Sequence, residues 1–177
     1  MTGQFALQLD GAVNNTSLVL AIELTESGKV LLFPGDAQVG SWLSWHEYKW
    51  KKTENEQLTK DVTAESLLKN TVLYKVSHHG SHNATVSDKG LEMMSHPELV
   101  AMIPEKEDSY NGILYKPLMD RLEKLCMGRV LVSADINYPP EALLAADAKP
   151  DRLPKADWDA FRNKLTVEET FVEYIVK

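Results

Sequence analysis

Hydrophobic and polar positions change their spacing along the chain, and these changes mark the predicted elements. Residues Phe5–Leu9 alternate between apolar and polar, which predicts a strand. Residues Ser17–Leu24 form a nearly continuous apolar run, which predicts a strand buried on both faces. After a turn at Ser27-Gly28, the segment Lys29–Phe33 predicts a third strand that ends at Pro34. The three strands predict a meander with short connections.

Helical spacing and further short strands follow this meander. Helices are predicted over Val39–Trp50, Thr63–Leu68, Asp88–Met94, Pro117–Met127 and Ala156–Leu165. Strands are predicted over Thr71–Val76, Leu99–Ile103, Arg129–Val132 and Thr170–Val176. The polar stretches Lys51–Asp61 and Tyr138–Pro154 predict loops, and Thr63 or Asp61 is the expected N-cap of the second helix. This order predicts one α/β (α+β) domain over residues 1–177, with a mixed sheet covered by helices.

The composition indicates which partners and which cellular compartment suit this domain. The chain has 177 residues, 44% of them hydrophobic, which is enough to fill one core. Its net charge of −7 disfavours long-range attraction to nucleic acid or to an anionic membrane. No apolar run approaches the ~18 residues of a membrane span, and no secretory signal pattern is visible. The lone cysteine, Cys126, excludes an intramolecular disulfide and a cysteine zinc cage, so we expect a buried structural thiol and a cytoplasmic protein.

The first candidate for chemistry is Asp36, which follows the strand Lys29–Phe33 and the turn-forming Gly35. A carboxylate just past the end of a buried strand is directed into the crevice beyond the strand ends, where ligands of layered α/β proteins bind. Aspartate is also a common helix cap, so Asp36 could instead cap the helix that is predicted to begin near Val39. The pattern leaves both interpretations open.

The second candidate is a histidine cluster that follows the strand Thr71–Val76. Three of the five histidines, His78, His79 and His82, lie within five positions of one another, beside a glycine. Neutral imidazole is the commonest protein ligand of zinc, so this clustering favours a metal site over a solvated polar turn. In an extended backbone His78 and His79 would point to opposite sides. One of the two is therefore expected to bind the metal, and the other to orient a substrate or to form a hydrogen bond within the site.

Three segments occur in an order that resembles metallo-β-lactamase-fold proteins. They are Asn14-Asn15-Thr16-Ser17-Leu18-Val19-Leu20, Leu32-Phe33-Pro34-Gly35-Asp36-Ala37 and Tyr74-Lys75-Val76-Ser77-His78-His79-Gly80-Ser81. The resemblance is closest to the branch that contains the ComEC-like hydrolase domains of DNA-uptake proteins, and it spans roughly half the chain. The combination of the three segments, rather than any one of them, carries the resemblance.

This resemblance implies an αββα sandwich with two zinc ions at one edge of its sheets. It implies that Asp36 is the carboxylate that bridges both ions, and that His79, or else His78, is a ligand of the second ion. The completed site would hydrolyse a phosphodiester or phosphoester, with Asp36, His78 and His79 as its catalytic residues. Metal ions ~3.5–4 Å apart would lower the pKa of a bound water there.

Three more residues are expected at the substrate. Asn15, with Ser17, matches the polar pair that precedes the buried strand in this family, and a structural role for the pair is equally open. Ser81 and His82 follow the double histidine directly. We therefore expect Asn15, Ser81 and His82 to bind substrate.

The chain departs from the family at its main metal-binding signature. The motif His-x-His-x-Asp-His precedes these segments in the family and is absent here, and no histidine precedes His46. One bridging aspartate and one histidine leave each ion short of the three protein ligands that catalytic zinc has. We therefore expect the C-terminal half of the fold: a fragment, a split subunit that an N-terminal half completes in cis or in trans, or a degenerate half. Zinc binding by this chain alone is expected to be weak or partial.

A non-catalytic interaction domain is the alternative. Exposed apolar surface would then mediate assembly with a partner half or in an oligomer, and contact with a membrane is not expected. The weaker candidates are His46, on a helix surface or near the site, His96, in a loop, and Asp135, at the same sheet edge or in a turn. The segment Tyr48–Lys52 could stack nucleotides or form a solvated helix end.

Overall fold

The fold is built around one mixed sheet. The computed structural model describes residues 17–54, 57–83, 85–104, 114–133, 149–151, 153–168 and 171–177. Within these residues, five strands form the sheet, in the order β1-β2-β5-β6-β7. They are β1 (Leu20–Glu23), β2 (Val30–Phe33), β5 (Thr71–Lys75), β6 (Val100–Ile103) and β7 (Val130–Val132). β1 and β2 are antiparallel, whereas β2, β5, β6 and β7 are parallel to one another. The predicted mixed sheet is confirmed.

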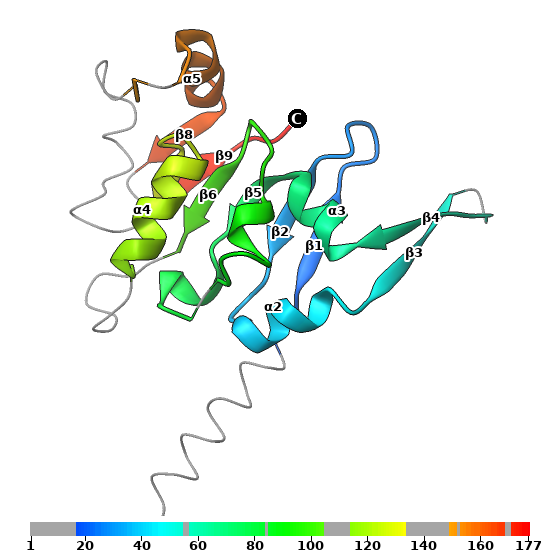
Figure 1. Cartoon of the computed structure of the whole chain (residues 1–177). Coiled ribbons are helices and arrows are strands. Elements are labelled where there is room, and N and C mark those ends of the chain that lie inside the picture. Colours follow the sequence, from blue (N-terminus) through cyan, green and yellow to red (C-terminus); the bar gives the residue numbers. More distant parts are fainter. Residues whose placement is uncertain are drawn as a thin grey trace, which may run out of the picture.

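Both faces of the sheet are covered (Figure 1). One face packs against α2 (Val39–Trp45), α3 (Ala64–Lys69), the 3₁₀ turn η2 (Leu91–Met93) and α4 (Lys116–Leu125). The other face packs against α5 (Lys155–Arg162) and the hairpin of β8 (Leu165–Glu168) and β9 (Phe171–Tyr174). The expectation of helices over a mixed sheet therefore holds, with a hairpin sharing one face.

The alternation of side chains along the strands divides the apolar residues between these two layers. Leu73 and Tyr74 are successive residues of β5 and are both buried, but they belong to different clusters. Tyr74 packs edge-on against Trp42 of α2, with 6.1 Å between the ring centroids. Leu73 faces the layer that contains Trp158 and Phe161 of α5. A strand buried on both faces reads as a continuous apolar run, which is what β5 shows.

One predicted burial is wrong. The apolar run Ser17–Leu24 contains β1, but among the described residues β1 is the outer strand of the sheet and not a central one. Leu20 and Ile22 remain 46% exposed each, and Leu18 is more exposed still. Leu20 lies opposite Phe33 and Ile22 opposite Leu31, so both point to the face on which α5 and the hairpin pack. A continuous apolar run predicted two covered faces, and this strand does not have them.

The segment after α2 is also corrected. The predicted helix Val39–Trp50 ends at Trp45, and the predicted loop Lys51–Asp61 is part of an antiparallel ribbon of β3 (Lys49–Glu54) and β4 (Gln57–Thr63). Trp50 lies opposite Val62 on one side of this ribbon, and the Lys51 ammonium pairs with the Asp61 carboxylate on the other. Apolar residues are too sparse in this segment to give the period of two that indicates a strand, so the spacing of the residues did not predict the ribbon. Figure 1 shows the ribbon projecting from the body of the molecule.

The boundaries of several other helices and strands agree with those predicted from the sequence. Thr63 is the N-cap of α3, where its hydroxyl accepts from the Ser66 N–H and the Ser66 hydroxyl accepts from the Thr63 N–H. β2, β5, β6, β7, α4, α5 and β9 lie within or close to their predicted ranges. The predicted helix Asp88–Met94 is reduced to η2, and β8 was not predicted. The predicted strand Phe5–Leu9 and most of the predicted loop Tyr138–Pro154 lie outside the described residues.

We predict that the buried thiol of Cys126 makes stability fall at alkaline pH. Cys126 is fully buried, as expected, and burial raises the pKa of its thiol to about 12. In the unfolded chain the thiol ionises as the pH rises through ~8.5, while the folded thiol stays protonated. The contribution of this thiol to the free energy of unfolding is fully present below pH ~8.5. Between that pH and the pKa of the folded state, the contribution is lost at up to ~1.4 kcal/mol per pH unit. Urea denaturation between pH 8 and pH 10 should therefore show a smaller decrease in the free energy of unfolding for Cys126→Ala than for the parent chain. An equal decrease in the two proteins would contradict the raised pKa of the thiol.

Candidate functional site

The turn after β2 positions Asp36. Gly35 has a φ of 58°, in the left-handed region that favours glycine. A Cβ built on Gly35 would lie 3.3 Å from the Leu18 carbonyl oxygen and 3.4 Å from the Ser17 Cβ, so the turn passes close against the chain that enters β1. The helix-cap interpretation of Asp36 is wrong, because Gln38 is the N-cap of α2 and no side-chain cap bond is present. The partly exposed Asp36 carboxylate is left for another role.

The turn after β5 holds the double histidine in an uncommon conformation. His78 has φ 43° and ψ 45°, His79 has φ 52° and ψ 27°, and Gly80 has φ 76°, so three successive residues are left-handed. Such a conformation costs of order 1–3 kcal/mol for a non-glycine residue and persists only where its surroundings hold it. The premise of an extended backbone at His78 and His79 is therefore wrong. The expectation that the His78 and His79 rings point to opposite sides therefore loses its basis.

Hydrogen bonds join these two turns to each other. The His78 N–H donates to the Gly35 carbonyl at 3.1 Å. The buried Ser77 hydroxyl donates to the Ala37 carbonyl at 2.6 Å. Asp36 lies between these two acceptor residues, so the double-histidine turn contacts the chain on both sides of it. Residues about 40 positions apart in the sequence are thus adjacent at one edge of the sheet.

The ring of His79 is oriented by the end of a third strand. Its Nδ1 lies 2.8 Å from the carbonyl oxygen of Pro104, the residue after β6. A carbonyl oxygen only accepts, so Nδ1 carries the proton and Nε2 presents its lone pair. A hydrogen bond from one ring nitrogen to a backbone carbonyl is the usual arrangement behind a metal-bound imidazole. His79 has the tautomer that a metal ligand needs.

His78 and Ser81 share one acceptor. His78 Nδ1 lies 3.3 Å from Asn83 Oδ1, and the Ser81 hydroxyl donates to the same oxygen at 2.8 Å. The longer of the two contacts holds the His78 ring less firmly than Pro104 holds the His79 ring. Both histidines use Nδ1 for these hydrogen bonds. This arrangement favours His79 as the ligand and gives Ser81 a role in the loop.

The three residues expected at the substrate are placed differently. Ser81 is part of the loop just described. The His82 ring is exposed and lies edge-on to Tyr115, with 6.4 Å between the centroids. Asn15 lies outside the described residues. Ser17, its partner in the predicted polar pair, lies against Gly35, beside the candidate site.

Sequence reasoning missed Lys75 and the pocket beside it. A pocket of 240 Å³ opens where β5, β6 and β7 end, and it is lined by Phe33, Leu73, Lys75, Met102, Ile103, Pro104, Leu131, Val132, Ser133 and Val172. Lys75 is its cationic residue: desolvation lowers the pKa of the half-buried ammonium, and the charge of Asp36 offsets part of that decrease. The available signal was a lysine at the end of a buried strand, three positions before the first histidine of the pair.

The described residues fit only part of a zinc centre. Asp36 and His79 have the right chemistry, since a carboxylate and a neutral imidazole are both zinc ligands. Within the described part of the chain, however, no group of three or more His, Cys, Asp or Glu side chains could hold a metal ion. Catalytic zinc has three protein ligands, so no catalytic step follows from these residues alone.

Two of the weaker candidates, His46 and His96, form hydrogen bonds outside the two turns. His46 follows α2, and its Nε2 donates to the Lys89 carbonyl at 2.7 Å. His96 is in a loop, where its Nδ1 accepts from the Glu98 N–H at 3.1 Å. The segment Tyr48–Lys52 is mostly strand β3 and not a helix end. Asp135 lies outside the described residues.

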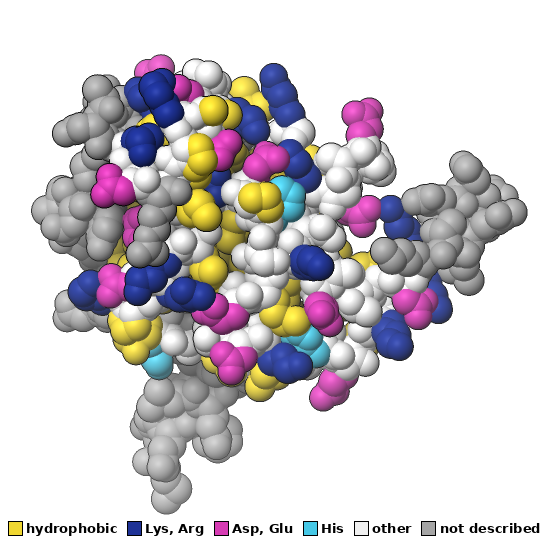
Figure 2. Space-filling model, turned by 45° about the horizontal axis from the view of Figure 1, so that its top comes forward, with side chains coloured by type: hydrophobic (Ala, Val, Ile, Leu, Met, Phe, Trp, Pro, Cys, Tyr) yellow, Lys and Arg dark blue, Asp and Glu magenta, His cyan; other side chains and the backbone are white. Residues whose placement is uncertain are grey.

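The charged side chains of the surface are of both signs. On the face shown in Figure 2, Lys and Arg side chains are interspersed with Asp and Glu. Among the described helices, none has both the length and the apolar character needed to cross a bilayer. Comparisons of the chain with protein-family models, curated proteins and solved structures gave no match.

Proposed function

We propose that this chain supplies one carboxylate, Asp36, and one imidazole, His79, to a zinc-dependent hydrolytic site. The remaining ligands come from outside the described residues, as in a metallo-β-lactamase fold whose other half carries the His-x-His-x-Asp-His motif. The observation that carries the proposal is the hydrogen bond from the His78 N–H to the Gly35 carbonyl. It joins the two turns that contain the proposed ligands.

The sheet order supports the proposal. β2, β5 and β6 are neighbouring parallel strands, so their carboxyl ends meet at one edge. Asp36 follows β2, His79 follows β5, and Pro104, which orients His79, follows β6. Ligands of open α/β sheets bind at this edge. The segments that follow these three strands thus contribute residues to one edge of the sheet.

A phosphodiester or phosphoester is the proposed substrate. Bound zinc would supply Lewis-acid chemistry and an activated water. The Asp36 carboxylate would supply negative charge beside the cations, and the Pro104 carbonyl would hold the His79 ring in position. The Lys75 ammonium, at the pocket beside the site, would attract an anionic substrate.

Zinc titration of variants tests the proposed ligands. The isolated chain is expected to bind zinc weakly, because it supplies too few ligands. Asp36→Asn and His79→Gln should each weaken that binding about tenfold or more, which corresponds to ~1.4 kcal/mol. His96→Gln is the matched control, because it removes an imidazole outside the turn. Calorimetry or competition with a chromophoric chelator measures the affinities. Loss of binding in His82→Gln but not in Asp36→Asn would instead indicate a site built from histidines alone, and would overturn the proposal.

An interaction domain without catalysis is the second candidate. The exposed Leu18, Leu20 and Ile22 on and before the outer strand favour it, because an uncovered apolar strip suits a partner surface. The zinc titration separates the two candidates. A pure interaction domain would show the same zinc affinity in Asp36→Asn, His79→Gln and the parent chain.

A further inference from the structure

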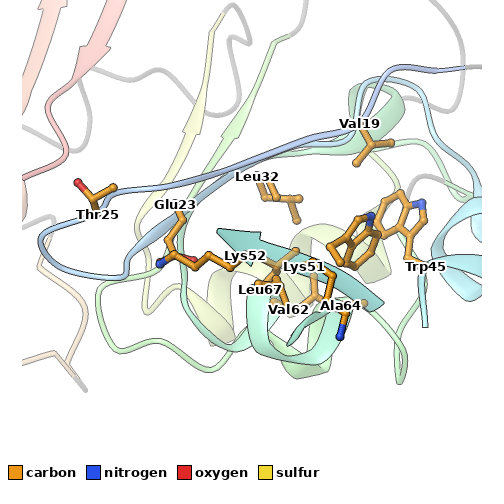
Figure 3. A pocket seen from close by; sticks show the side chains of 13 residues that line it. Val19, Glu23, Thr25, Leu32, Trp45, Lys51, Lys52, Val62, Ala64 and Leu67 are labelled. Atoms are coloured by element: carbon orange, nitrogen blue, oxygen red, sulfur yellow. The ribbon is translucent and has the colours of Figure 1, made fainter. Parts of the chain in front are cut away.

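The lysines that line pockets of the described residues differ in whether a carboxylate pairs with them. Lys51 and Lys52 line a pocket of 440 Å³ between β1, α3 and the β3–β4 ribbon. Lys51 pairs with Asp61, and the Lys52 ammonium lies 2.7 Å from Glu23 Oε1. Figure 3 shows Glu23 and Lys52 together at one end of this pocket. The charge of each of these two lysines is therefore offset by a carboxylate.

Lys75, at the end of β5, has no such pairing. Among the described residues, no carboxylate or carbonyl oxygen accepts a hydrogen bond from its ammonium. Burial lowers the pKa of this half-buried ammonium, and the charge of Asp36 offsets part of the decrease. Because the ammonium has lost part of its hydration and has gained no acceptor, an anion that reaches it would form a favourable charge-assisted hydrogen bond.

The pocket that Lys75 lines is small and mostly apolar. Apart from Lys75 and Ser133, its lining residues are apolar. Its volume is 240 Å³, whereas about 150 Å³ of apolar cavity is enough for a benzene ring. Phe33, Met102 and Val172 line it from β2, β6 and the β8–β9 hairpin. Aromatic rings make favourable contacts with other rings and with thioether sulfur, so the pocket suits one aromatic ring.

The same pocket adjoins the proposed zinc ligands. Pro104 lines it, and the Pro104 carbonyl oxygen lies 2.8 Å from His79 Nδ1. Lys75 also lines it, and the Lys75 ammonium is close enough to Asp36 for the carboxylate to shift its pKa. Two of the lining residues thus connect the pocket with the two proposed ligands.

We propose that this pocket selects the substrate of the site, and that the preferred substrate is a phosphate ester with a single aromatic ring. The ring occupies the apolar pocket, and the phosphoryl oxygens contact the Lys75 ammonium. The inference rests on the proposed function for the reaction but not for the binding, because neither contact involves zinc.

Three probes test the two contacts separately. Phenyl phosphate, inorganic phosphate and phenol are each titrated into the full chain by calorimetry, with a chelator present to remove zinc. Phenyl phosphate should bind about tenfold more tightly than either of the others, because inorganic phosphate lacks the ring and phenol lacks the charge. Failure of phenyl phosphate to bind, or an affinity equal to that of either other probe, would overturn the proposal. Since zinc is absent, this result is independent of the zinc titration that tests Asp36 and His79.

Replacement of Lys75 tests the contact with the phosphoryl group. Lys75→Met removes the ammonium and keeps an unbranched apolar side chain, so it should weaken phenyl phosphate binding about tenfold and leave phenol binding unchanged. Lys69→Met is the matched control, because Lys69 is an exposed lysine of α3 that does not line the pocket. Equal losses of phenyl phosphate affinity in the two variants would overturn the role of Lys75.

A larger side chain on the hairpin tests the contact with the ring. Val172→Phe fills the pocket from β9, where an aromatic residue suits a strand, and should lower the affinity for phenyl phosphate to that for inorganic phosphate. Ile175→Phe is the control, because Ile175 is 45% exposed and does not line the pocket. Urea denaturation checks that both variants fold. If folded Val172→Phe bound phenyl phosphate as tightly as Ile175→Phe, the ring would not occupy this pocket.

Discussion

Asp36→Asn is expected to abolish phosphodiester hydrolysis when this chain is combined with a half of the fold that bears His-x-His-x-Asp-His. The expected decrease in kcat is about 10³-fold or more, because the neutral amide removes the negative charge that would lie between two cations. Bis(p-nitrophenyl) phosphate is a suitable substrate, and metal content measured on the same samples should fall from two ions toward one or none.

The control for this variant is Asp88→Asn. Asp88 is an exposed aspartate in the turn before η2, so its replacement makes the same change of charge away from the sheet edge. Its activity should equal that of the unaltered chain. If Asp36→Asn retained both ions and full activity, Asp36 would have no place in the metal site.

Trp42→Ala is expected to have the largest effect on stability. Trp42 is fully buried, and its ring centroid lies 4.6 Å from that of Trp45 and 6.1 Å from that of Tyr74. Truncation of a buried tryptophan leaves a cavity and costs about 3–5 kcal/mol. That is a large part of the 5–15 kcal/mol typical of a domain, so urea denaturation should show a much lower midpoint with an unchanged slope.

Two companion variants keep this prediction testable. Leu43→Ala changes the next residue of α2, whose side chain is 47% exposed, and should cost about 0.5 kcal/mol or less. Trp42→Phe retains part of the ring and should have an intermediate effect if Trp42→Ala does not fold. Equal midpoints for Trp42→Ala and Leu43→Ala would mean that the core does not depend on Trp42.

The inner part of the sheet could be predicted because its residues carry one consistent signal. β5 is apolar and β-branched, is buried on both faces, and is followed, after Val76, by the polar residues of the double-histidine turn. β1 has the same apolar character but lies at the edge of the sheet. The number of neighbouring strands is a property of the tertiary fold. A single segment therefore predicts the strand but not its place in the sheet.

The candidate site was accessible to sequence reasoning only in part. Asp36 and the double histidine each follow a strand, and their meeting follows from the pairing of β2 with β5, which the sequence does not state. The left-handed backbone at His78 and His79 could not be read from their side chains. The contact between His79 and Pro104 depends on where β6 ends. The types of the residues at the candidate site could thus be read from the sequence, whereas their geometry could not.

The pairing of β2 with β5 also links the candidate site to cooperative folding. α2, the ribbon and α3 lie between these strands in the sequence, so the two turns come together only when a long loop of chain has closed. A short peptide that contains only the double histidine would lack both the Gly35 and the Pro104 carbonyls that hold its turn. Any ion held jointly by Asp36 and His79 would therefore stabilise the whole sheet against unfolding, and its affinity would report on the integrity of the tertiary structure.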